Sequence, residues 1–398
     1  MIAKETKNHL ASNKVLIFVP PIYSLKTSDG GPSGFIAQNI LGHSSQYYEL
    51  SVDLPTNSQN YSLWNKIIKN LKLTFGIPLA EEIKRQKKRT EANLNNLNEF
   101  KWWGESSQQH FTDINAQNYK FIYFHDVWTM KACIPLLSPL QIIILQPHCP
   151  ELPSQEIASQ PRFSDSDVKW SVEAERDAFA RADIIILPNS YTMEIYKPLI
   201  TSKSRIYYLL SGAQQRNCLH KYPLNDKIHL LYIGRRNHIK GFDIVLDGFQ
   251  QAYTSRKDIE LILVGKGIKI DEEGIYDIGF TDSVHDWVYS CDYVINCNRQ
   301  SYFDLSILEA LSIGIPIIMS CTGGHKQFQM NKTKGIIDVG RPSSKNIAKI
   351  LLSSEVKKKE FNKEQCDSNQ QLYLSQYSDY IYRQNLENLL SSIIKENN

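Results

Sequence analysis

The sequence predicts an α/β protein of two domains, each built on a parallel sheet covered by helices on both faces. The 398 residues exceed what one ordinary hydrophobic core organises and suit two domains of average size. Short apolar, β-branched runs recur along the chain with helical segments between them. Runs that are apolar throughout, with no polar residue at alternate positions, are typical of buried parallel strands. The composition, 42% hydrophobic and 22% charged, is that of an ordinary globular protein.

Nine apolar runs predict the strands, and a polar segment divides them into two sheets. The first sheet is predicted from the runs at 14–20, 121–124, 142–147, 183–190 and 205–210, and the second from those at 228–234, 260–265, 292–297 and 316–321. Between the two sets, residues 211–227 are polar and aperiodic and contain Pro223, so we place the domain boundary there. The first domain then covers 1–212 and the second 213–376.

Two further segments have helical periodicity. Apolar residues at helical spacing in 377–398 predict a terminal amphipathic helix that packs back on the first domain. Residues 64–72 carry apolar side chains on one face and lysines on the other, and a basic run follows at 84–89. Such a helix can lie on an anionic membrane surface. The alternative is a surface helix that packs on its own domain.

Charge and cysteine content exclude several classes of protein. A formal net charge of +3 gives no case for nucleic-acid binding, which usually needs a strongly basic domain. The seven cysteines include no CxxC pair, so neither a disulfide framework nor a structural zinc site is indicated. The polar N-terminus is unlike a signal peptide, and no run approaches the ~20 apolar residues that span a bilayer. We therefore expect a cytoplasmic protein, either free or peripheral on the inner face of a membrane.

The segment 228–249 combines a strand with the features of an anion site. The predicted strand ends at Gly234 and Arg235, and after a short polar loop Lys240 and Gly241 open a helix. A glycine at the strand end allows a tight turn, and two cations beside a helix N-terminus suit a diphosphate. The alternative is that Arg235 and Lys240 are solvated loop residues.

The segment 302–324 places a carboxylate in an apolar helix. Glu309 lies between Leu308 and Ala310, and a carboxylate in such surroundings needs hydrogen-bond donors. The hydroxyls of a ribose would supply two. The alternative is a capping box, in which Glu309 bonds back to a helix start at Ser306.

Together these two segments resemble the donor domain of the family 4 glycosyltransferases. The shared pattern is G-R-x(n)-K-G, a G-F pair at 279–280, then E-A-x3-G-x-P from Glu309 and a following G-G at 323–324. The resemblance covers roughly residues 205–330. It implies the GT-B architecture, in which two Rossmann-like doubly wound domains face a central cleft. It also implies metal-independent transfer of a sugar, with retention of anomeric configuration, from a nucleoside-diphosphate sugar to a glycan or lipid-linked acceptor.

The resemblance also implies the roles of individual residues. His125, which follows the run at 121–124, takes the place of the family's active-site histidine, and His148 is expected to shape the cleft. With Arg235 and Lys240, His125 forms the predicted catalytic set. The predicted donor-binding residues are Gly30, Gly31, Gly212, Gly234, Phe280, Ser301, Phe303, Asp304, Leu305, Ser306 and Glu309.

One departure from the family pattern bears on the choice of sugar. Ser301 stands eight residues before Glu309, where the family usually has a glutamate that contacts the transferred sugar. Asp304 stands where glycine is common, and it is the candidate to take over part of that role. Because the first glutamate is missing, a non-catalytic GT-B subunit that binds a glycan or a partner protein is an alternative. A nucleotide-sugar epimerase is another.

A D-x-D string at 165–167 invites a different interpretation. In GT-A glycosyltransferases such a string holds a metal ion. Here it follows a polar loop and precedes a helical pattern, where serine and aspartate are ordinary N-cap residues. We therefore expect no metal and no other cofactor.

Overall fold

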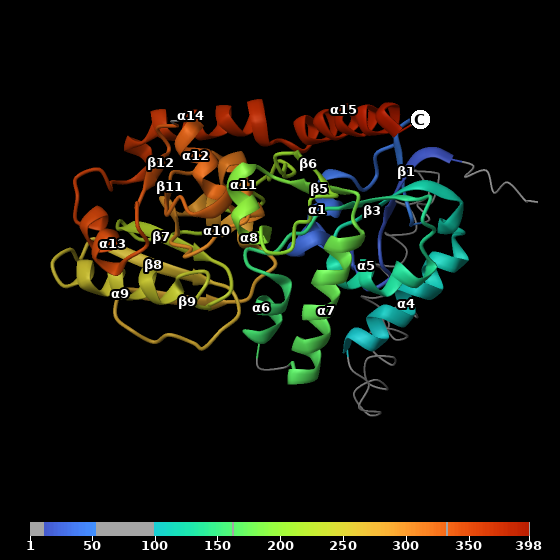
Figure 1. Cartoon of the computed structure of the whole chain (residues 1–398). Coiled ribbons are helices and arrows are strands. Elements are labelled where there is room, and N and C mark those ends of the chain that lie inside the picture. The colour runs from blue at the N-terminus through green and yellow to red at the C-terminus, as the bar shows by residue number, and fades with distance from the viewer. Residues whose placement is uncertain (1–11, 53–98, 161–162, 332, 398) are drawn as a thin grey trace, which may run out of the picture.

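The computed structural model describes residues 12–52, 99–160, 163–331 and 333–397. Two six-stranded parallel sheets, each flanked by helices, form two lobes that lie side by side (Figure 1). The predicted amphipathic helix at 64–72, with its two alternative roles, and the basic run at 84–89 lie outside the described residues. No helix in the part of the chain that is described is both long and apolar enough to cross a membrane.

The first lobe has the strand order β2-β1-β3-β4-β5-β6. Its strands are β1 (Ser12–Phe18), β2 (Tyr48–Leu50), β3 (Tyr119–Phe124), β4 (Ile142–Leu145), β5 (Ile184–Leu187) and β6 (Arg205–Tyr208). Its helices are α1 (Gly31–Asn39), α4 (Glu99–Asp113), α5 (Val127–Cys133), α6 (Pro153–Ala158), α7 (Asp165–Arg181) and α8 (Met193–Tyr196).

The second lobe has the strand order β12-β11-β10-β7-β8-β9. Its strands are β7 (Ile228–Ile233), β8 (Ile259–Val264), β9 (Ile275–Gly279), β10 (Tyr293–Asn296), β11 (Ile317–Met319) and β12 (Ile336–Asp338). The helices that follow β7 are α9 (Phe242–Tyr253), α10 (Val284–Ser290), α11 (Leu305–Ile313), α12 (Lys326–Asn331), α13 (Ser344–Leu351), α14 (Lys363–Leu372) and α15 (Asp379–Asn397).

Each of the nine predicted runs overlaps a strand, and the predicted α/β architecture of two parallel sheets is confirmed. The strands that the sequence did not predict are β2, β9 and β12, and all three lie at sheet edges. Edge strands are short and have one exposed side, so their sequences lack the continuous apolar run of a central strand. In β9, for example, Tyr276 is 50% exposed and Ile278 is 38% exposed.

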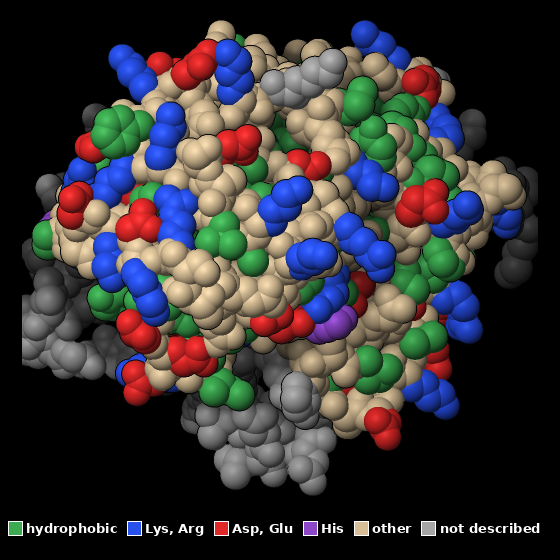
Figure 2. Space-filling model, turned by 90° about the vertical axis from the view of Figure 1, so that its left-hand side faces the viewer, with side chains coloured by type: hydrophobic (Ala, Val, Ile, Leu, Met, Phe, Trp, Pro, Cys, Tyr) green, Lys and Arg blue, Asp and Glu red, His purple; other side chains and the backbone are tan. Residues whose placement is uncertain are grey.

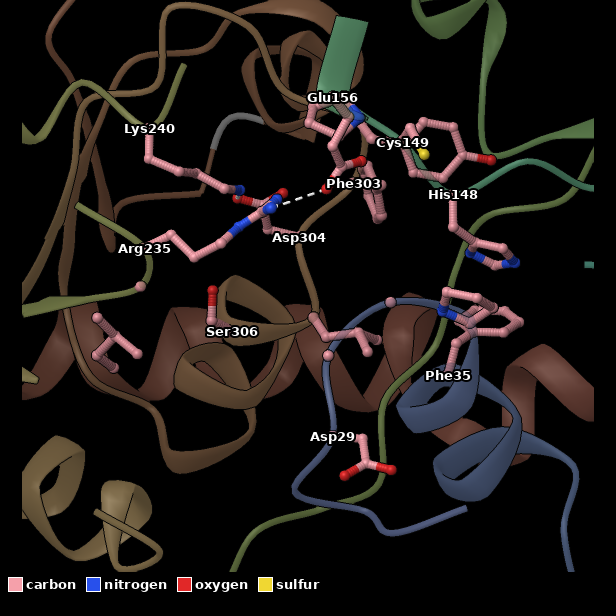
Figure 3. A pocket seen from close by; sticks show the side chains of 18 of the residues that line it. Asp29, Phe35, His148, Cys149, Glu156, Arg235, Lys240, Phe303, Asp304 and Ser306 are labelled. Carbon is pink, nitrogen blue, oxygen red and sulfur yellow. Dashed lines mark hydrogen bonds and ion pairs between the residues drawn. The ribbon is translucent and has the colours of Figure 1, made fainter. Parts of the chain in front are cut away.

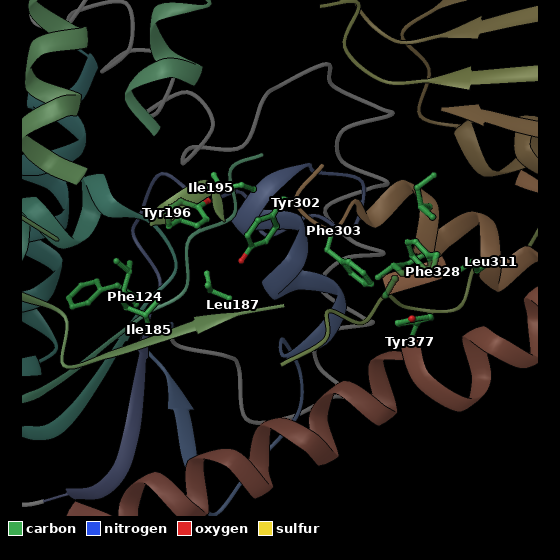
Figure 4. Packing of buried hydrophobic residues seen from close by; sticks show 14 of the residues in the cluster. Phe124, Ile185, Leu187, Ile195, Tyr196, Tyr302, Phe303, Leu311, Phe328 and Tyr377 are labelled. Atoms are coloured by element: carbon green, nitrogen blue, oxygen red, sulfur yellow. The ribbon is translucent and has the colours of Figure 1, made fainter. Parts of the chain in front are cut away.

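One hydrophobic cluster runs from the first lobe into the second (Figure 4). Phe124 and Leu187 enter it from the first sheet, and Phe303 and Phe328 enter it from the second lobe. Tyr302 forms the junction, because its ring makes an edge contact with Tyr196 of α8 at 6.3 Å between centroids. The lobes are thus joined by packed apolar side chains as well as by the connecting chain.

The last helix, α15, returns from the second lobe along the first (Figure 1). Tyr382, Leu386 and Leu390 are buried in a cluster that contains Val15 and Ile17 of β1. Near the end of this helix, Glu396 forms an ion pair with Arg205. The C-terminal segment therefore packs against the first sheet although it follows the second lobe in sequence.

The exposed charges of the second lobe are mixed. On the face shown in Figure 2, Lys and Arg side chains are interspersed with Asp and Glu side chains on a mainly uncharged surface. This mixture agrees with the small formal net charge of +3.

Candidate active site

A cavity of about 650 Å³ lies between the two lobes, at the carboxyl ends of the central strands. This is where open parallel sheets usually bind their ligands. Twelve of the fourteen predicted site residues line it: Gly30, Gly31, His125, Gly234, Arg235, Lys240, Phe280, Phe303, Asp304, Leu305, Ser306 and Glu309.

The structure places the other two, Gly212 and Ser301, outside the cavity wall. Gly212 is packed between α1 and α15, so that a Cβ built on it would lie 2.7 Å from Asn39 Oδ1 and 2.7 Å from Tyr382 Cβ. Ser301 is fully buried, and its hydroxyl contacts Asn298 Nδ2 at 3.1 Å and Thr322 Oγ1 at 3.2 Å. Both residues therefore serve the packing around the cavity and do not face its interior.

The end of β7 directs Arg235 toward the cavity (Figure 3). Gly234 has φ +142°, and a Cβ on Gly265 would lie 2.1 Å from Gly234 O, so the two strand ends approach as only glycines allow. The next residue, Arg236, is buried in a bidentate ion pair with Asp277. With Arg236 fixed in this way, Arg235 extends into the cavity, where its Nη1 donates to Glu156 Oε1 at 2.8 Å.

Lys240 is presented by a tight turn before α9. Gly241 has φ +60°, and a Cβ there would lie 1.9 Å from Cys297 O, so no other residue fits. The ammonium group of Lys240 contacts Asp304 Oδ2 at 2.6 Å, and both side chains are largely buried. Burial opposes ionisation of Asp304, but the charge of Lys240 and further contacts outweigh it, and the pKa lies well below its ordinary value.

Glu309 is held by several donors on the inner face of α11. Its Oε1 accepts from Arg216 Nη2 at 2.7 Å and from Gln38 Nε2 at 2.9 Å, and its Oε2 lies 3.2 Å from His285 Nε2. The capping box, which was the alternative interpretation of Glu309, is not formed, because α11 begins at Leu305 and Glu309 is already in its second turn. Burial raises the pKa of Glu309, but His285 and Arg216 outweigh it and leave the pKa lowered.

Two stacked histidines form the first-lobe wall. His125 Nδ1 lies 3.0 Å from His148 Nε2, and the ring of Phe35 packs on His148. Burial and the neighbouring His148 lower the pKa of His125, and burial lowers the pKa of His148 to about 3. Both imidazoles are therefore neutral near pH 7. In the contact between them, one ring nitrogen carries the proton and donates it to the other ring nitrogen.

The D-x-D string lies in the first turn of α7, and neither of its aspartates is the N-cap residue. Ser164 caps α7, and Asp167 accepts from Ser164 N at 2.8 Å and from Ser164 Oγ at 2.7 Å. Neither Asp165 nor Asp167 lines the cavity. Within the described ranges, no group of three or more His, Cys, Asp or Glu side chains is placed to hold a metal ion.

Sequence reasoning did not single out several residues that contact the predicted set, including His285 and Asn298. Arg216 lies in the connection between the lobes, Gln38 in α1 and Glu156 in α6, and each pairs with a predicted residue of the second lobe. Their partners lie 79 to 271 positions away in sequence. A local motif carries no signal for pairs of this kind.

Comparisons with known proteins show what this chain is similar to. Residues 227–352 match the family described as "Glycosyl transferases group 1". Sucrose-phosphate synthase from Thermosynechococcus elongatus superposes with a TM-score of 0.61 at 14% identity, covering 96% of this chain and all of that one. The chain has the GT-B fold. HepE of Anabaena, solved with UDP and glucose, gives a TM-score of 0.55 at 15% identity over 71% of this chain and 81% of that one.

Two curated sequences are similar to this GT-B chain. The lipopolysaccharide 1,2-N-acetylglucosaminetransferase of Salmonella typhimurium is 26% identical over 205 residues, which is 45% of this chain and 50% of the relative. An uncharacterized 41.2 kDa protein of the cps region of Klebsiella pneumoniae is 24% identical over 196 residues, 44% of this chain and 51% of the relative. The matches thus span about half the length of each curated relative.

Proposed function

We propose that the chain is a glycosyltransferase that moves a sugar, most simply a hexose, from a nucleoside diphosphate to a glycan or lipid-linked acceptor. One observation carries this proposal. A single cavity between the lobes brings Arg235, Lys240 and the first turn of α11 to one wall and His125 to the opposite wall. The group 1 glycosyltransferase match over the second lobe supports the proposal, and so does HepE, which was solved with UDP-glucose.

The second-lobe wall suits a departing diphosphate. In glycosyl transfer, negative charge builds on the leaving group as the glycosidic bond breaks. Arg235 and Lys240 supply two positive charges, and Leu305 and Ser306 lie in the first turn of α11, where backbone N–H groups lack partners within the helix. Donors that are fixed before the reaction can be the largest single term in such catalysis. The site therefore stabilises the leaving group with its own side chains, and we propose that no metal ion is needed.

Glu309 is the proposed ligand of the ribose. Arg216 and His285 keep its carboxylate ionised, so it is a strong acceptor for hydroxyl donors. Gln38, which also bonds Glu309, comes from α1 of the first lobe. The proposed ribose site is thus tied to the contact between the lobes.

His125 is proposed to act as a neutral group beside the transferred sugar. Its contact with His148 leaves its Nε2 without a hydrogen-bond partner among the described residues. A buried polar atom of this kind is costly unless a ligand pairs with it. We propose that a sugar hydroxyl supplies the partner, and that the acceptor attacks from the face that the diphosphate leaves, with retention.

The cellular role is proposed from the relatives. One is named for lipopolysaccharide synthesis and the other is encoded in a cps region, so we propose assembly of a bacterial surface polysaccharide in the cytoplasm, at the inner face of the membrane.

Calorimetric titration and thermal melting with UDP, GDP, dTDP and their sugar conjugates test the proposal. A bound ligand raises the melting temperature by mass action. We expect one nucleotide to bind and its sugar to be transferred or slowly hydrolysed. This activity should persist in the presence of EDTA. NMR of the product should show that the anomeric configuration is retained. Absence of binding to all three nucleotides contradicts the proposal and favours a non-catalytic subunit. Conversion of the nucleotide sugar to an epimer without acceptor contradicts transfer.

A further inference from the structure

Asp304 is the N-cap residue of α11, yet its carboxylate does not cap that helix. Aspartate at an N-cap position ordinarily accepts from the first N–H groups of the helix. Here no such bond forms. Instead Asp304 Oδ2 accepts from Lys240 Nζ at 2.6 Å and from Asn298 Nδ2 at 2.8 Å. The side chain is thus held away from its usual local role and toward the cavity that it lines (Figure 3).

The second carboxylate oxygen of Asp304 is available to a ligand. No donor from the described part of the chain hydrogen-bonds to Oδ1, and this oxygen is not among the fully buried atoms that lack partners. The depressed pKa keeps the group ionised throughout the neutral range. An ionised carboxylate with one fixed oxygen and one open oxygen accepts hydroxyl donors in a defined direction.

From its position, Ser301 cannot accept a hydrogen bond from a ligand in the cavity. It is fully buried, and its hydroxyl contacts Asn298 and Thr322. Asn298 Nδ2 in turn donates to Asp304, so the buried end of the loop supports the carboxylate that reaches the cavity. On this loop, Asp304 is the acidic side chain at the cavity.

The position of Asp304 is unfavourable for a bare diphosphate. A helix N-terminus attracts anions, and a carboxylate at the same place repels them and occupies the nearby cation Lys240. The cost is offset only if another part of the ligand donates hydrogen bonds to the carboxylate. The transferred sugar is the part of the donor that has such hydroxyls.

We infer that Asp304 determines sugar specificity by accepting hydroxyl groups of the transferred sugar, while it weakens binding of the nucleoside diphosphate alone. This inference rests on the proposed function. It gives Asp304 opposite effects on two ligands that differ only in the sugar.

Calorimetric titration of the full chain and of Asp304→Asn tests the inference. The probes are UDP with UDP-glucose and UDP-N-acetylglucosamine, GDP with GDP-mannose, and dTDP with dTDP-glucose. We expect Asp304→Asn to bind the nucleoside diphosphate about threefold more tightly, because like-charge repulsion is removed. We expect it to bind the matching nucleotide sugar about tenfold more weakly, because a hydrogen bond to a charged group is lost.

Two further variants keep the test decisive. Asp304→Gly removes the side chain altogether and is expected to shift both affinities in the same directions. Glu364 lies on α14 and forms an exposed ion pair with Lys334. Glu364→Gln removes one negative charge there and is expected to change neither affinity. Deoxy-sugar analogues of the donor complete a double-mutant cycle between the protein and the ligand. Loss of the contacted hydroxyl should weaken binding to wild type but not to Asp304→Asn.

The outcomes separate the inference from the proposed function. If wild type binds a nucleotide and its sugar conjugate but neither Asp304 variant changes their affinity ratio, the inference is wrong and the proposed function stands. If wild type binds no nucleotide, both are wrong. If both Asp304 variants weaken the bare diphosphate and the nucleotide sugar equally, Asp304 supports only the fold of the site, and the inference is again overturned.

Discussion

Arg235 of the second lobe and Glu156 of the first form an ion pair of 2.8 Å across the cavity. Arg235 is also a cation that we propose for the diphosphate, so the ligand and Glu156 compete for it. The Arg235 side chain is half exposed, and ion pairs of this exposure contribute at most about 1 kcal/mol. The pair therefore connects the lobes weakly and can exchange when an anion enters.

Replacing Glu156 tests this exchange. Glu156→Gln frees Arg235, so we expect nucleoside diphosphates to bind about twofold to fivefold more tightly, in keeping with a pair worth no more than about 1 kcal/mol. Calorimetric titration measures the change. Glu194→Gln, at an exposed carboxylate of α8 outside the cavity, serves as the control for net charge. Weaker binding by Glu156→Gln would show that Glu156 does not compete with the ligand for Arg235.

Removing the proposed leaving-group cations should impair transfer itself. We expect Arg235→Ala and Lys240→Ala each to lower kcat/KM by about 10²-fold or more, since each loses a partner of the developing charge. Glu309→Ala is expected to have an effect of similar size through the ribose. Steady-state kinetics measures the effects, and melting temperatures close to wild type exclude misfolding. Near-normal turnover in all three variants would contradict the assignment of the donor site.

Arg216 is expected to stabilise the contact between the lobes. It joins the connecting segment to Glu309 of α11 and, through Thr27 O at 2.7 Å, to the loop before α1. Arg216→Met leaves a buried carboxylate with fewer donors, so we expect the free energy of unfolding to fall by about 1.5–3 kcal/mol. Urea unfolding measures the loss. Because Glu309→Gln removes the buried charge, the double variant should lose less than the sum of the single losses. Additive losses would show that the two residues do not act as a pair.

The sequence predicts the parts of this molecule whose neighbours in space are also neighbours in sequence. A central strand such as β8 is apolar throughout because helices cover both faces, and that pattern is visible in one window of residues. The turn of Gly241 and the placement of Lys240 follow from a local motif for the same reason. Edge strands such as β9 have an exposed side, so their sequences lack the continuous apolar run. For this reason the sequence did not predict them.

The electrostatic pairs of the cavity could not be predicted in this way. Arg216 lies in a polar connection that resembles any surface loop. Its role in the site depends on its ion pair with Glu309, which is 93 positions away in sequence. Glu156 is an ordinary helix residue until the second lobe brings Arg235 beside it. Ser301 stands where the family usually has a glutamate, but its burial behind Asn298 depends on how the loop packs, which no spacing reveals.

The buried histidines make a prediction about acid stability. Burial lowers the pKa of His148 to about 3 and of His325 to about 4, whereas both have the ordinary value of about 6.5 when the chain unfolds. Below pH 6.5 the unfolded chain takes up protons that the folded chain does not, so stability is full above that pH and falls as the pH decreases. Between pH 7 and pH 5 each such histidine should cost about 2 kcal/mol of unfolding free energy.

Urea unfolding of wild type and His148→Gln at several pH values from 7 to 5 checks this prediction. Carboxylates titrate mostly below this range, so the slope reports on histidine. We expect the variant to lose about 2 kcal/mol less than wild type over the interval, whatever its stability at pH 7. His43→Gln is the matched control, because His43 is exposed at the surface, and its slope should change less than that of His148→Gln. An unchanged slope in His148→Gln would mean that His148 takes up a proton in the folded protein, and the neutral His125–His148 pair would then be wrong.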